Sequence, residues 1–317
     1  MSNNMTLVIT AFGGPETLAP VFKDIPEPAA GEVLVRVEFA GVNPIDAKTR
    51  AGLGWAAQQN KDNLPWTPGY DMAGVIVATG EGVEGLEAGQ RVAGLVGFPG
   101  QGGAYSQYLV TAADTLSVVP ETVNAQTAAA LPVAGQTAWQ ALEKAGVKAG
   151  EKVLILAGAG GVGHVAIQLA KALGADVFAS CSQTNVGFVQ ALGASAVDYT
   201  AGDIAGQVSD CDVLIDLVGG NVGIAALDTL KEGGRVVTIP TITAEAVKEA
   251  AGEKALEADG MLVSPSKAQM DSLLEMADSG RLLVSVGGKY PLEQGAQAHS
   301  VIESGHVRGK LLLEMPN

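Results

Sequence analysis

The chain has 317 residues, 34 acidic and 19 basic side chains, and a formal net charge of −15 at pH 7. This charge makes nucleic acid and anionic membrane surfaces unfavourable partners, because both are negatively charged. The length predicts two domains, and no apolar stretch reaches the roughly 18 residues of a spanning helix. The first residues, "MSNNMTLVIT", lack the build of a signal peptide, and two cysteines do not make a disulfide framework. We therefore expect a cytoplasmic protein.

The first 122 residues predict a mostly antiparallel β domain. Alternating apolar and polar residues indicate strands at 32–43, 72–80, 90–97 and 104–114, and no helices alternate with them. The tail, 282–315, reads as strand, helix, strand. We expect it to return to the first domain, which then comprises residues 1–122 and 284–317.

Residues 123–283 predict a second domain of the α/β class. An Ala-rich segment, 124–146, has helical spacing interrupted at Pro132. Continuous apolar runs then alternate with helical patterns, which is typical of a doubly wound parallel sheet, the Rossmann fold. Strands are expected at 152–156, 176–180, 195–199, 212–219, 234–239 and 260–264, and helices at 162–173, 185–192, 221–230 and 267–279.

A glycine-rich stretch, "GAGGVG", lies between the first strand and the first helix of this domain. Gly158, Gly160 and Gly163 match G-x-G-x-x-G, and this context predicts a dinucleotide site. Gly158 is expected to permit a tight turn, Gly160 to admit the pyrophosphate, and Gly163 to allow close helix packing. The alternative is a purely structural strand–turn–helix connection.

The next strand ends without the acidic residue that usually binds the ribose of NAD. Its last residues and the following turn carry Ser180, Ser182, Thr184 and Asn185 instead. Hydroxyl and amide groups can bind a 2′-phosphate that a carboxylate would repel, so the segment favours NADP(H). Asn185 has a second interpretation as a helix N-cap, and the segment contains no Lys or Arg.

Candidate catalytic groups lie in the β domain. The three histidines have no zinc-site spacing, and no G-x-S-x-G motif is present, so we expect neither a metal site nor a serine hydrolase. "AGVNPIDAKTRAG" (40–52) carries Asn43 and Lys48, and "WTPGYDMAGV" (66–75) carries Tyr70. The alternatives without a catalytic role are a solvated turn for 40–52, with Asp46 and Arg50 in water, and an ordinary core position for Tyr70.

Together these segments resemble the medium-chain dehydrogenase/reductase superfamily, and within it the zinc-free quinone oxidoreductases and the plant-type enone and alkenal oxidoreductases. The motifs run in order as "GVNPIDAK", "PGYDMAGV", "LPVAGQTAWQAL", "GAGGVGHVAIQLAKALGA", "SQTN", "DLVGG" and "GHVRGKLLL". Metal-dependent members have Cys where this chain has Asn43, and His-Glu where it has Tyr70-Asp71. The resemblance implies a GroES-like catalytic domain, a Rossmann domain, NADPH in a cleft between them, and a homodimer.

The resemblance also implies a set of cofactor-binding residues. Relatives often carry Lys in the 2′-phosphate loop, where this chain has Gln183 or Thr184. Lys310 has a second interpretation as a residue that only stabilises its strand. The implied set is Gly161 and Val162 at the pyrophosphate; Ser182, Gln183, Thr184, Asn185 and Tyr199 at the 2′-phosphate or adenosine; Ile239 at the nicotinamide half; Lys48 near the nicotinamide ribose and carbonyl; Thr137 at a helix start; Lys310 at the C-terminus; and Val218 in "DLVGG".

These features predict hydride transfer from NADPH to a quinone or to the β-carbon of an α,β-unsaturated carbonyl. Lys48, Tyr70 and Asn43 would stabilise the developing oxyanion, and Lys48, Tyr70 or water would supply the proton. Loops 54–66 and 97–103 would shape the substrate pocket. The alternatives are an enoyl-thioester reductase and a non-catalytic NADPH-binding or interaction protein.

Overall fold

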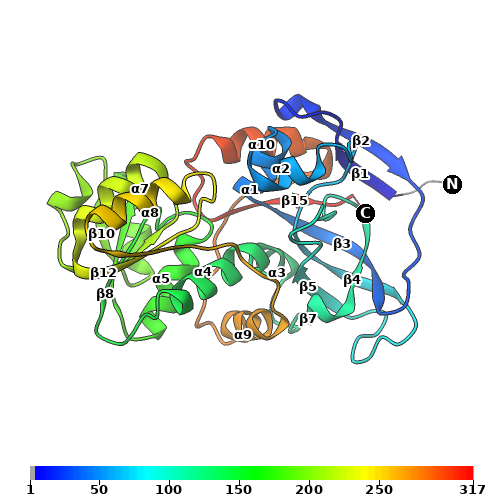
Figure 1. Cartoon of the computed structure of the whole chain (residues 1–317). Helices are drawn as coiled ribbons and strands as arrows, with labels where there is room; N and C mark the ends of the chain where they lie inside the picture. Colours follow the sequence, from blue (N-terminus) through cyan, green and yellow to red (C-terminus); the bar gives the residue numbers. More distant parts are fainter. Residues whose placement is uncertain (1–3, 317) are drawn as a thin grey trace. The chain divides into compact units, whose positions relative to one another are not determined.

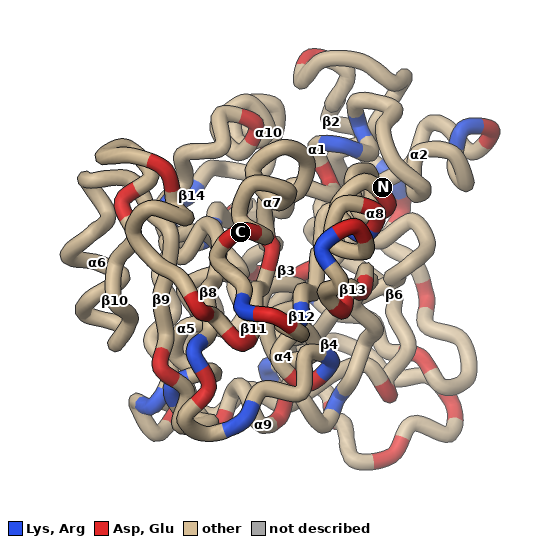
Figure 2. The backbone as a smooth tube through the Cα atoms, turned by 60° about the vertical axis from the view of Figure 1, so that its left-hand side comes forward, with Lys and Arg blue, Asp and Glu red and all other residues tan. Residues whose placement is uncertain are grey.

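The computed structural model describes residues 4–316, so the first three residues of the N-terminal stretch examined above lie outside it. The chain divides into two compact units, shown in Figure 1: unit 1 is Met1–Gln136 with Ser264–Asn317, and unit 2 is Thr137–Val263. Acidic residues are spread over both units (Figure 2). Within the described residues, no helix is long and apolar enough to cross a bilayer.

Unit 1 is built on a seven-stranded, mostly antiparallel sheet. Its neighbouring strands run in the order β14-β15-β3-β4-β5-β7, and β6 pairs with β3. The four predicted strands of the first domain are all present. The bounds are β3 (Glu32–Val42), β4 (Asp71–Thr79), β5 (Arg91–Leu95), β6 (Tyr108–Ala112), β7 (Leu116–Val118), β14 (Val286–Pro291) and β15 (Lys310–Glu314).

A two-stranded sheet of β1 (Asn4–Ile9) and β2 (Leu18–Lys23) was not predicted. Every residue of β1 is buried, so its sequence lacks the polar and apolar alternation that identifies a half-buried strand. The predicted return of the tail is correct. β15 pairs antiparallel with β3, and α10 (Gly295–Glu303) lies between β14 and β15 in the chain.

Segment 40–52 is not a solvated turn. Residues 44–50 form α1 (Pro44–Arg50), with Asn43 at the N-cap and Pro44 in the first position, where its missing N–H costs no hydrogen bond. Asp46 and Arg50 are buried, which corrects the expectation that they lie in water. The following α2 (Gly54–Asn60) falls in the predicted substrate loop.

Two further helices extend unit 1 beyond the predicted domain boundaries at 122 and 284. α3 (Ala125–Ala130) packs on β3 and β4, and α9 (Lys267–Asp278) packs on β7. The Ser117 hydroxyl donates to the Lys267 carbonyl at 3.3 Å. The compact units therefore divide near 136 and 264, because these helices pack on the antiparallel sheet.

Unit 2 contains a six-stranded parallel sheet in the order β10-β9-β8-β11-β12-β13. This confirms the doubly wound Rossmann fold. The strands are β8 (Lys152–Ile155), β9 (Asp176–Cys181), β10 (Ser195–Asp198), β11 (Cys211–Asp216), β12 (Leu230–Thr238) and β13 (Glu257–Gly260), and the helices are α5 (Gly163–Ala172), α6 (Val186–Ala191), α7 (Gly220–Ala226) and α8 (Ala244–Glu253).

Two predictions in this region are wrong in detail. The last strand was expected at 260–264, but β13 pairs through the polar residues before it, because an edge strand does not need a continuous apolar run. Helix α4 (Pro132–Lys144) begins at Pro132, so Thr137 lies at its sixth residue rather than at a helix start. Its side chain is buried.

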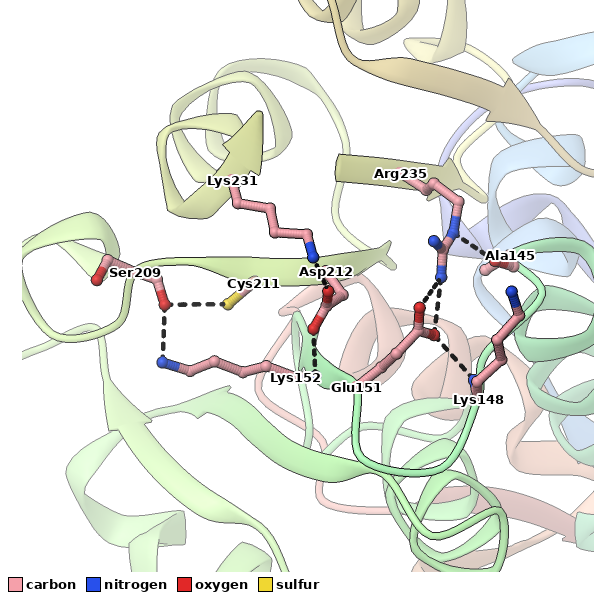
Figure 3. Close-up of polar contacts among 9 residues, drawn as sticks. All are labelled: Ala145, Lys148, Glu151, Lys152, Ser209, Cys211, Asp212, Lys231 and Arg235. Carbon is pink, nitrogen blue, oxygen red and sulfur yellow. Dashed lines mark hydrogen bonds and ion pairs between the residues drawn. The ribbon is translucent and has the colours of Figure 1, made fainter. Parts of the chain in front are cut away.

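The amino ends of the central strands of unit 2 are joined by the polar network drawn in Figure 3. The Lys152 backbone N–H donates to Asp212 at 2.7 Å, and Asp212 pairs with Lys231. Arg235 donates two 2.8 Å bonds to Glu151. These bonds stabilise the edge of the sheet formed by the amino ends of the strands. In this fold, ligands bind at the opposite edge, outside the carboxyl ends of the strands.

Candidate functional site

The glycine loop connects β8 to α5 by close backbone packing. A Cβ on Gly163 would lie 2.2 Å from the Ala157 carbonyl oxygen, and one on Gly158 would lie 2.6 Å from the Ala179 Cβ. The residue with positive φ is Ala157, at +50°. Gly158 therefore serves packing against β9, and the tight turn expected of it occurs one residue earlier.

The glycine loop leads directly into a helix, which is the arrangement expected at a pyrophosphate site. A Cβ on Gly160 would meet two Ala157 atoms, at 3.2 and 4.0 Å, so Gly160 is less crowded than Gly158 and Gly163. Gly161 and Val162 lead into the ten-residue helix α5, whose first amides can bind an anion. The close packing at Gly158 and Gly163 agrees with the predicted dinucleotide site, which stays a prediction.

Ser180 does not have the role that the sequence predicted for it. Its side chain is buried, its hydroxyl accepts the Ala157 N–H at 3.0 Å, and its carbonyl accepts the Gly158 N–H at 2.8 Å. The hydroxyl is thus used inside the protein to position the glycine loop. This corrects its assignment to the 2′-phosphate.

The other residues of the predicted 2′-phosphate loop come together. Ser182 is bonded by Thr184 (3.0 Å between hydroxyl oxygens) and by the Asn185 amide, which donates at 3.2 Å. Asn185 occupies the N-cap position of α6 without a side-chain capping bond. The Tyr199 N–H donates to the Cys181 carbonyl at 3.1 Å, and the Tyr199 side chain is 48% exposed. Hydroxyl and amide groups therefore gather at the carboxyl ends of β9 and β10.

A charge change in this loop is expected to alter cofactor preference. Thr184 is exposed, so Thr184→Lys places a cation where a 2′-phosphate is expected, and Thr184→Asp places an anion there. We expect the ratio of kcat/KM for NADPH to that for NADH to rise about tenfold in the first variant and to fall about tenfold in the second, since tenfold is about 1.4 kcal/mol. Steady-state kinetics with both cofactors measure the ratio. The same substitutions at exposed Gln190 are the control, and equal effects at both positions would contradict the assignment.

Sequence reasoning missed Asp216, which positions two of the expected cofactor-binding residues, Val218 and Ile239. This buried carboxylate accepts the Val218 and Gly219 N–H groups at 3.0 and 2.7 Å and the Thr238 hydroxyl at 2.8 Å. The Asp216 carbonyl accepts the Ile239 N–H at 2.9 Å. Asp216 thereby joins the loops after β11 and β12. The signal in the sequence that could have identified Asp216 is an acidic residue three positions before a pair of glycines, in "DLVGG".

In unit 1, the predicted residues Asn43 and Lys310 meet Asp71 in a buried triad. The Lys310 ammonium donates to the Asn43 side-chain carbonyl and, at 2.8 Å, to Asp71. Asn43 donates to the same Asp71 oxygen at 2.9 Å, and the other Asp71 oxygen accepts the Val133 N–H at 2.6 Å. Lys310 is 3% and Asp71 0% exposed. This geometry favours the structural interpretation of Lys310.

Tyr70 lies next to this triad in sequence but bonds elsewhere. Its hydroxyl donates to the Gly100 carbonyl at 2.8 Å, and its ring packs on Phe98 with centroids 5.0 Å apart. Burial raises the pKa of the phenol above its ordinary value, with a smaller contribution from the negative charge of Asp46. The hydroxyl therefore stays protonated, and its one proton is donated to the Gly100 carbonyl.

Lys48 lies in the last turn of α1 and is the most accessible of the predicted catalytic residues. Neighbouring atoms still remove part of its hydration, and this burial lowers the pKa of its ammonium. A lowered pKa makes an ammonium a better proton donor.

A second buried chain, also missed by the sequence, runs from α1 to α10. The Tyr105 hydroxyl lies 3.4 Å from the Asp46 carboxylate and 3.2 Å from the His299 ring, and Asp46 accepts the Asn43 backbone N–H at 2.8 Å. Burial raises the pKa of Asp46 to about 7, helped by the charge of Asp71 and opposed by Lys310. Burial and the Arg50 cation lower the pKa of His299 to about 3.

The raised pKa of Asp46 predicts a pH-dependent stability. Folded protein binds this proton more tightly than unfolded chain, so the stability it contributes is complete below about pH 4 and lost as the pH rises through about 7. His299 has the opposite slope, since its depressed pKa lowers stability as the pH falls below about 6.5. The pH dependence of the wild-type stability therefore contains both contributions.

Comparison of the wild type with the variant Asp46→Asn separates the contribution of Asp46 from that of His299. We expect the free energy of unfolding of the variant, minus that of wild type, to increase by at most about 1.4 kcal/mol per pH unit between about pH 5 and 7 and to level off above about 8. Urea titrations across this range measure the difference. A difference that does not change with pH would contradict the raised pKa.

Comparison with known proteins relates both units to one family. The alcohol dehydrogenase GroES-like domain model matches residues 29–121, and the zinc-binding dehydrogenase model matches residues 192–313. The chloroplastic quinone-oxidoreductase homolog of Spinacia oleracea is 34% identical over 318 residues, covering 95% of each chain. The chain belongs to the medium-chain dehydrogenase/reductase superfamily.

Within this superfamily the chain lies in the quinone and alkenal oxidoreductase branch. The structure of the quinone oxidoreductase from Coxiella burnetii matches with a TM-score of 0.96 and 40% identity, covering 99% of this chain and 100% of that one. The chloroplastic NADPH-dependent alkenal/one oxidoreductase of Arabidopsis thaliana is 32% identical over 300 residues, covering 91% of this chain and 73% of its own. This medium-chain protein is therefore an oxidoreductase of the NAD(P)H-dependent type.

The zinc named in one family description does not fit the residues found here. Asn43 and Asp71 already bond the Lys310 ammonium, and the Tyr70 hydroxyl already bonds Gly100. A metal ion at the triad would lie beside a buried cation. Among residues 4–316, no three His, Cys, Asp or Glu side chains group as a metal site.

Proposed function

We propose that the protein is a zinc-independent, NADPH-dependent reductase of quinones or α,β-unsaturated carbonyl compounds. The observation that carries this proposal is the Lys310 ammonium in the triad, where it bonds Asn43 and Asp71. Relatives named as quinone and alkenal/one oxidoreductases support the substrate class. The hydroxyl-rich 182–185 loop supports NADPH.

Bound NADPH would supply a hydride, which carries two electrons and one proton. The hydride would form a C–H bond at the β-carbon of the enone as the donor C–H bond breaks. The C=C pair would shift to the bond between the α-carbon and the carbonyl carbon, and the carbonyl π pair would move to the oxygen, which gives an enolate. A proton from solvent or a side chain then completes the two-electron reduction. For a quinone the same sum of one hydride and one proton gives the hydroquinone.

The residues of this chain would orient the substrate and stabilise the oxyanion. Lys48 is the principal proton donor in this proposal, because it is accessible and its pKa is lowered. Tyr70 supports the site through its protonated hydroxyl and its contact with Phe98. Asn43 would contribute indirectly, because its amide donates to Asp71 and its side-chain carbonyl accepts from Lys310.

The test is oxidation of NADPH and NADH at 340 nm with 9,10-phenanthrenequinone, 1,4-benzoquinone, but-3-en-2-one, 2-hexenal and a simple ketone, after dialysis against EDTA. We expect turnover of quinones or enones with NADPH, unchanged by the chelator. Loss of activity after EDTA would overturn the zinc-independent part. NADPH binding without turnover would favour the non-catalytic alternative, and turnover only of enoyl thioesters would favour the thioester reductase.

We also propose a homodimer in the cytoplasm, as the sequence suggests. Light scattering after size-exclusion chromatography tests the dimer, which would give about twice 32.0 kDa. Fractionation of the source cells tests the compartment, since the plant relatives are named as chloroplastic.

A further inference from the structure

Three aromatic rings from separate segments of unit 1 form one cluster. Phe98 lies between the other two: its centroid is 5.0 Å from that of Tyr70 and 5.7 Å from that of Trp55. The ring planes meet at 73° and 82°. Tyr70 is buried, whereas Trp55 and Phe98 are half-buried. We call Trp55 and Phe98 the aromatic wall.

The wall connects the segment that carries Lys48, the proposed proton donor, with the segment that carries Tyr70. The Leu53 N–H donates to the Lys48 carbonyl at 2.8 Å, and Leu53 is the N-cap of α2, which carries Trp55. Phe98 contacts Tyr70 directly. The wall thus contacts Tyr70 through Phe98, and Trp55 lies on the helix that follows the Lys48 segment.

Loop 97–103, which carries Phe98, is held at several points. The Val96 N–H donates to the Tyr70 carbonyl at 2.8 Å, the Ala104 N–H donates to the Gly69 carbonyl at 3.0 Å, and the Tyr70 hydroxyl reaches Gly100 at 2.8 Å. A Cβ on Gly102 would lie 2.3 Å from the Gly69 carbonyl oxygen. A ring held in place loses little entropy when it binds a planar ligand.

We propose that Trp55 and Phe98 determine substrate specificity by stacking on planar ring substrates such as quinones, in preference to open-chain enals. This inference rests on the proposed reductase activity and adds the residues that choose within its substrate class. Aromatic rings gain contact energy from a flat conjugated partner in offset-stacked or edge-to-face geometry. An open-chain enal offers a smaller conjugated plane, so it loses less when the wall is removed.

The experiment compares kcat/KM for 9,10-phenanthrenequinone and 2-hexenal in wild type, Trp55→Ala, Trp55→Phe and Phe98→Leu. Both Trp55→Ala and Phe98→Leu are expected to lose about tenfold with the quinone, which corresponds to 1.4 kcal/mol, and less than about threefold with the enal. Trp55→Phe keeps an aromatic face and should recover most of the quinone activity. Phe98→Leu keeps apolar bulk, so its selective loss would identify the ring itself. Phe22→Ala removes an exposed aromatic ring on β2 and should change neither substrate.

The outcomes separate this inference from the proposed function. A wild type that reduces both substrates, with wall variants that lose equally on both or on neither, overturns the inference alone. A wild type that reduces neither overturns the proposed function as well. Quenching of tryptophan fluorescence by phenanthrene, a planar ligand that cannot be reduced by hydride, gives a second reading. Quenching in wild type that disappears in Trp55→Ala is expected, and equal quenching in both proteins would contradict stacking on Trp55.

Discussion

Replacement of Lys310 by Met is expected to lower the free energy of unfolding by about 3 to 5 kcal/mol, because it leaves the Asp71 carboxylate buried without its counter-charge. Both partners of this 2.8 Å ion pair are almost completely inaccessible to water. Asn43 would also lose the ammonium that bonds its side-chain carbonyl. Urea or thermal unfolding monitored by circular dichroism measures the change.

The control for this substitution is Lys289→Met on β14, where the side chain is exposed. It should change stability by less than about 0.5 kcal/mol. The double variant Asp71→Asn/Lys310→Met removes both charges and should recover part of the loss. Equal, small effects of Lys310→Met and Lys289→Met would show that the buried pair is unimportant.

Replacement of Gly163 by Val is expected to raise the Kd for NADPH at least 100-fold. The new Cβ would overlap the Ala157 carbonyl oxygen, 2.2 Å away, and the Gly158 Cα, 2.8 Å away. Both are backbone atoms, so the glycine loop itself must move, and the overpacking also costs about 1 to 3 kcal/mol of stability. Fluorescence titration with NADPH and a parallel melting curve measure the two effects.

Gly187→Ala on α6 is the matched control. An added Cβ there meets nothing within 4 Å, and alanine favours a helix over glycine by up to about 1 kcal/mol. Its Kd for NADPH should be unchanged and its stability equal or slightly higher. A Gly163→Val protein that melts like wild type and binds NADPH normally would remove the glycine loop from the cofactor site.

The parallel sheet and the glycine loop could be predicted because their signals are local. A buried parallel strand is a continuous apolar run, and Gly158, Gly160 and Gly163 follow such a run directly. The same rule misplaced the last strand, since the edge residues that pair are polar. It also overlooked β1, which a single short sequence pattern does not distinguish from a loop.

Burial of polar side chains could not be predicted from the sequence. Asp46 looks like a solvated residue of a turn, yet its partner Tyr105 lies 59 positions away in the chain, and His299, the partner of Tyr105, lies 194 positions beyond Tyr105. Ser180 likewise resembles a ligand contact, and only the three-dimensional neighbourhood shows that its hydroxyl holds Ala157. Charge compensation of Asp71 depends on Lys310, 239 positions away.

The pairing of β15 with β3 has a consequence for synthesis on the ribosome. Unit 1 takes its residues from both ends of the chain, whereas unit 2 is one continuous segment. All strands of the parallel sheet are therefore available while the antiparallel sheet still lacks β14 and β15. Until residue 310 has left the exit tunnel, Asp71 lacks the Lys310 ammonium, so the N-terminal part of unit 1 stays incompletely folded until β14 and β15 have been translated.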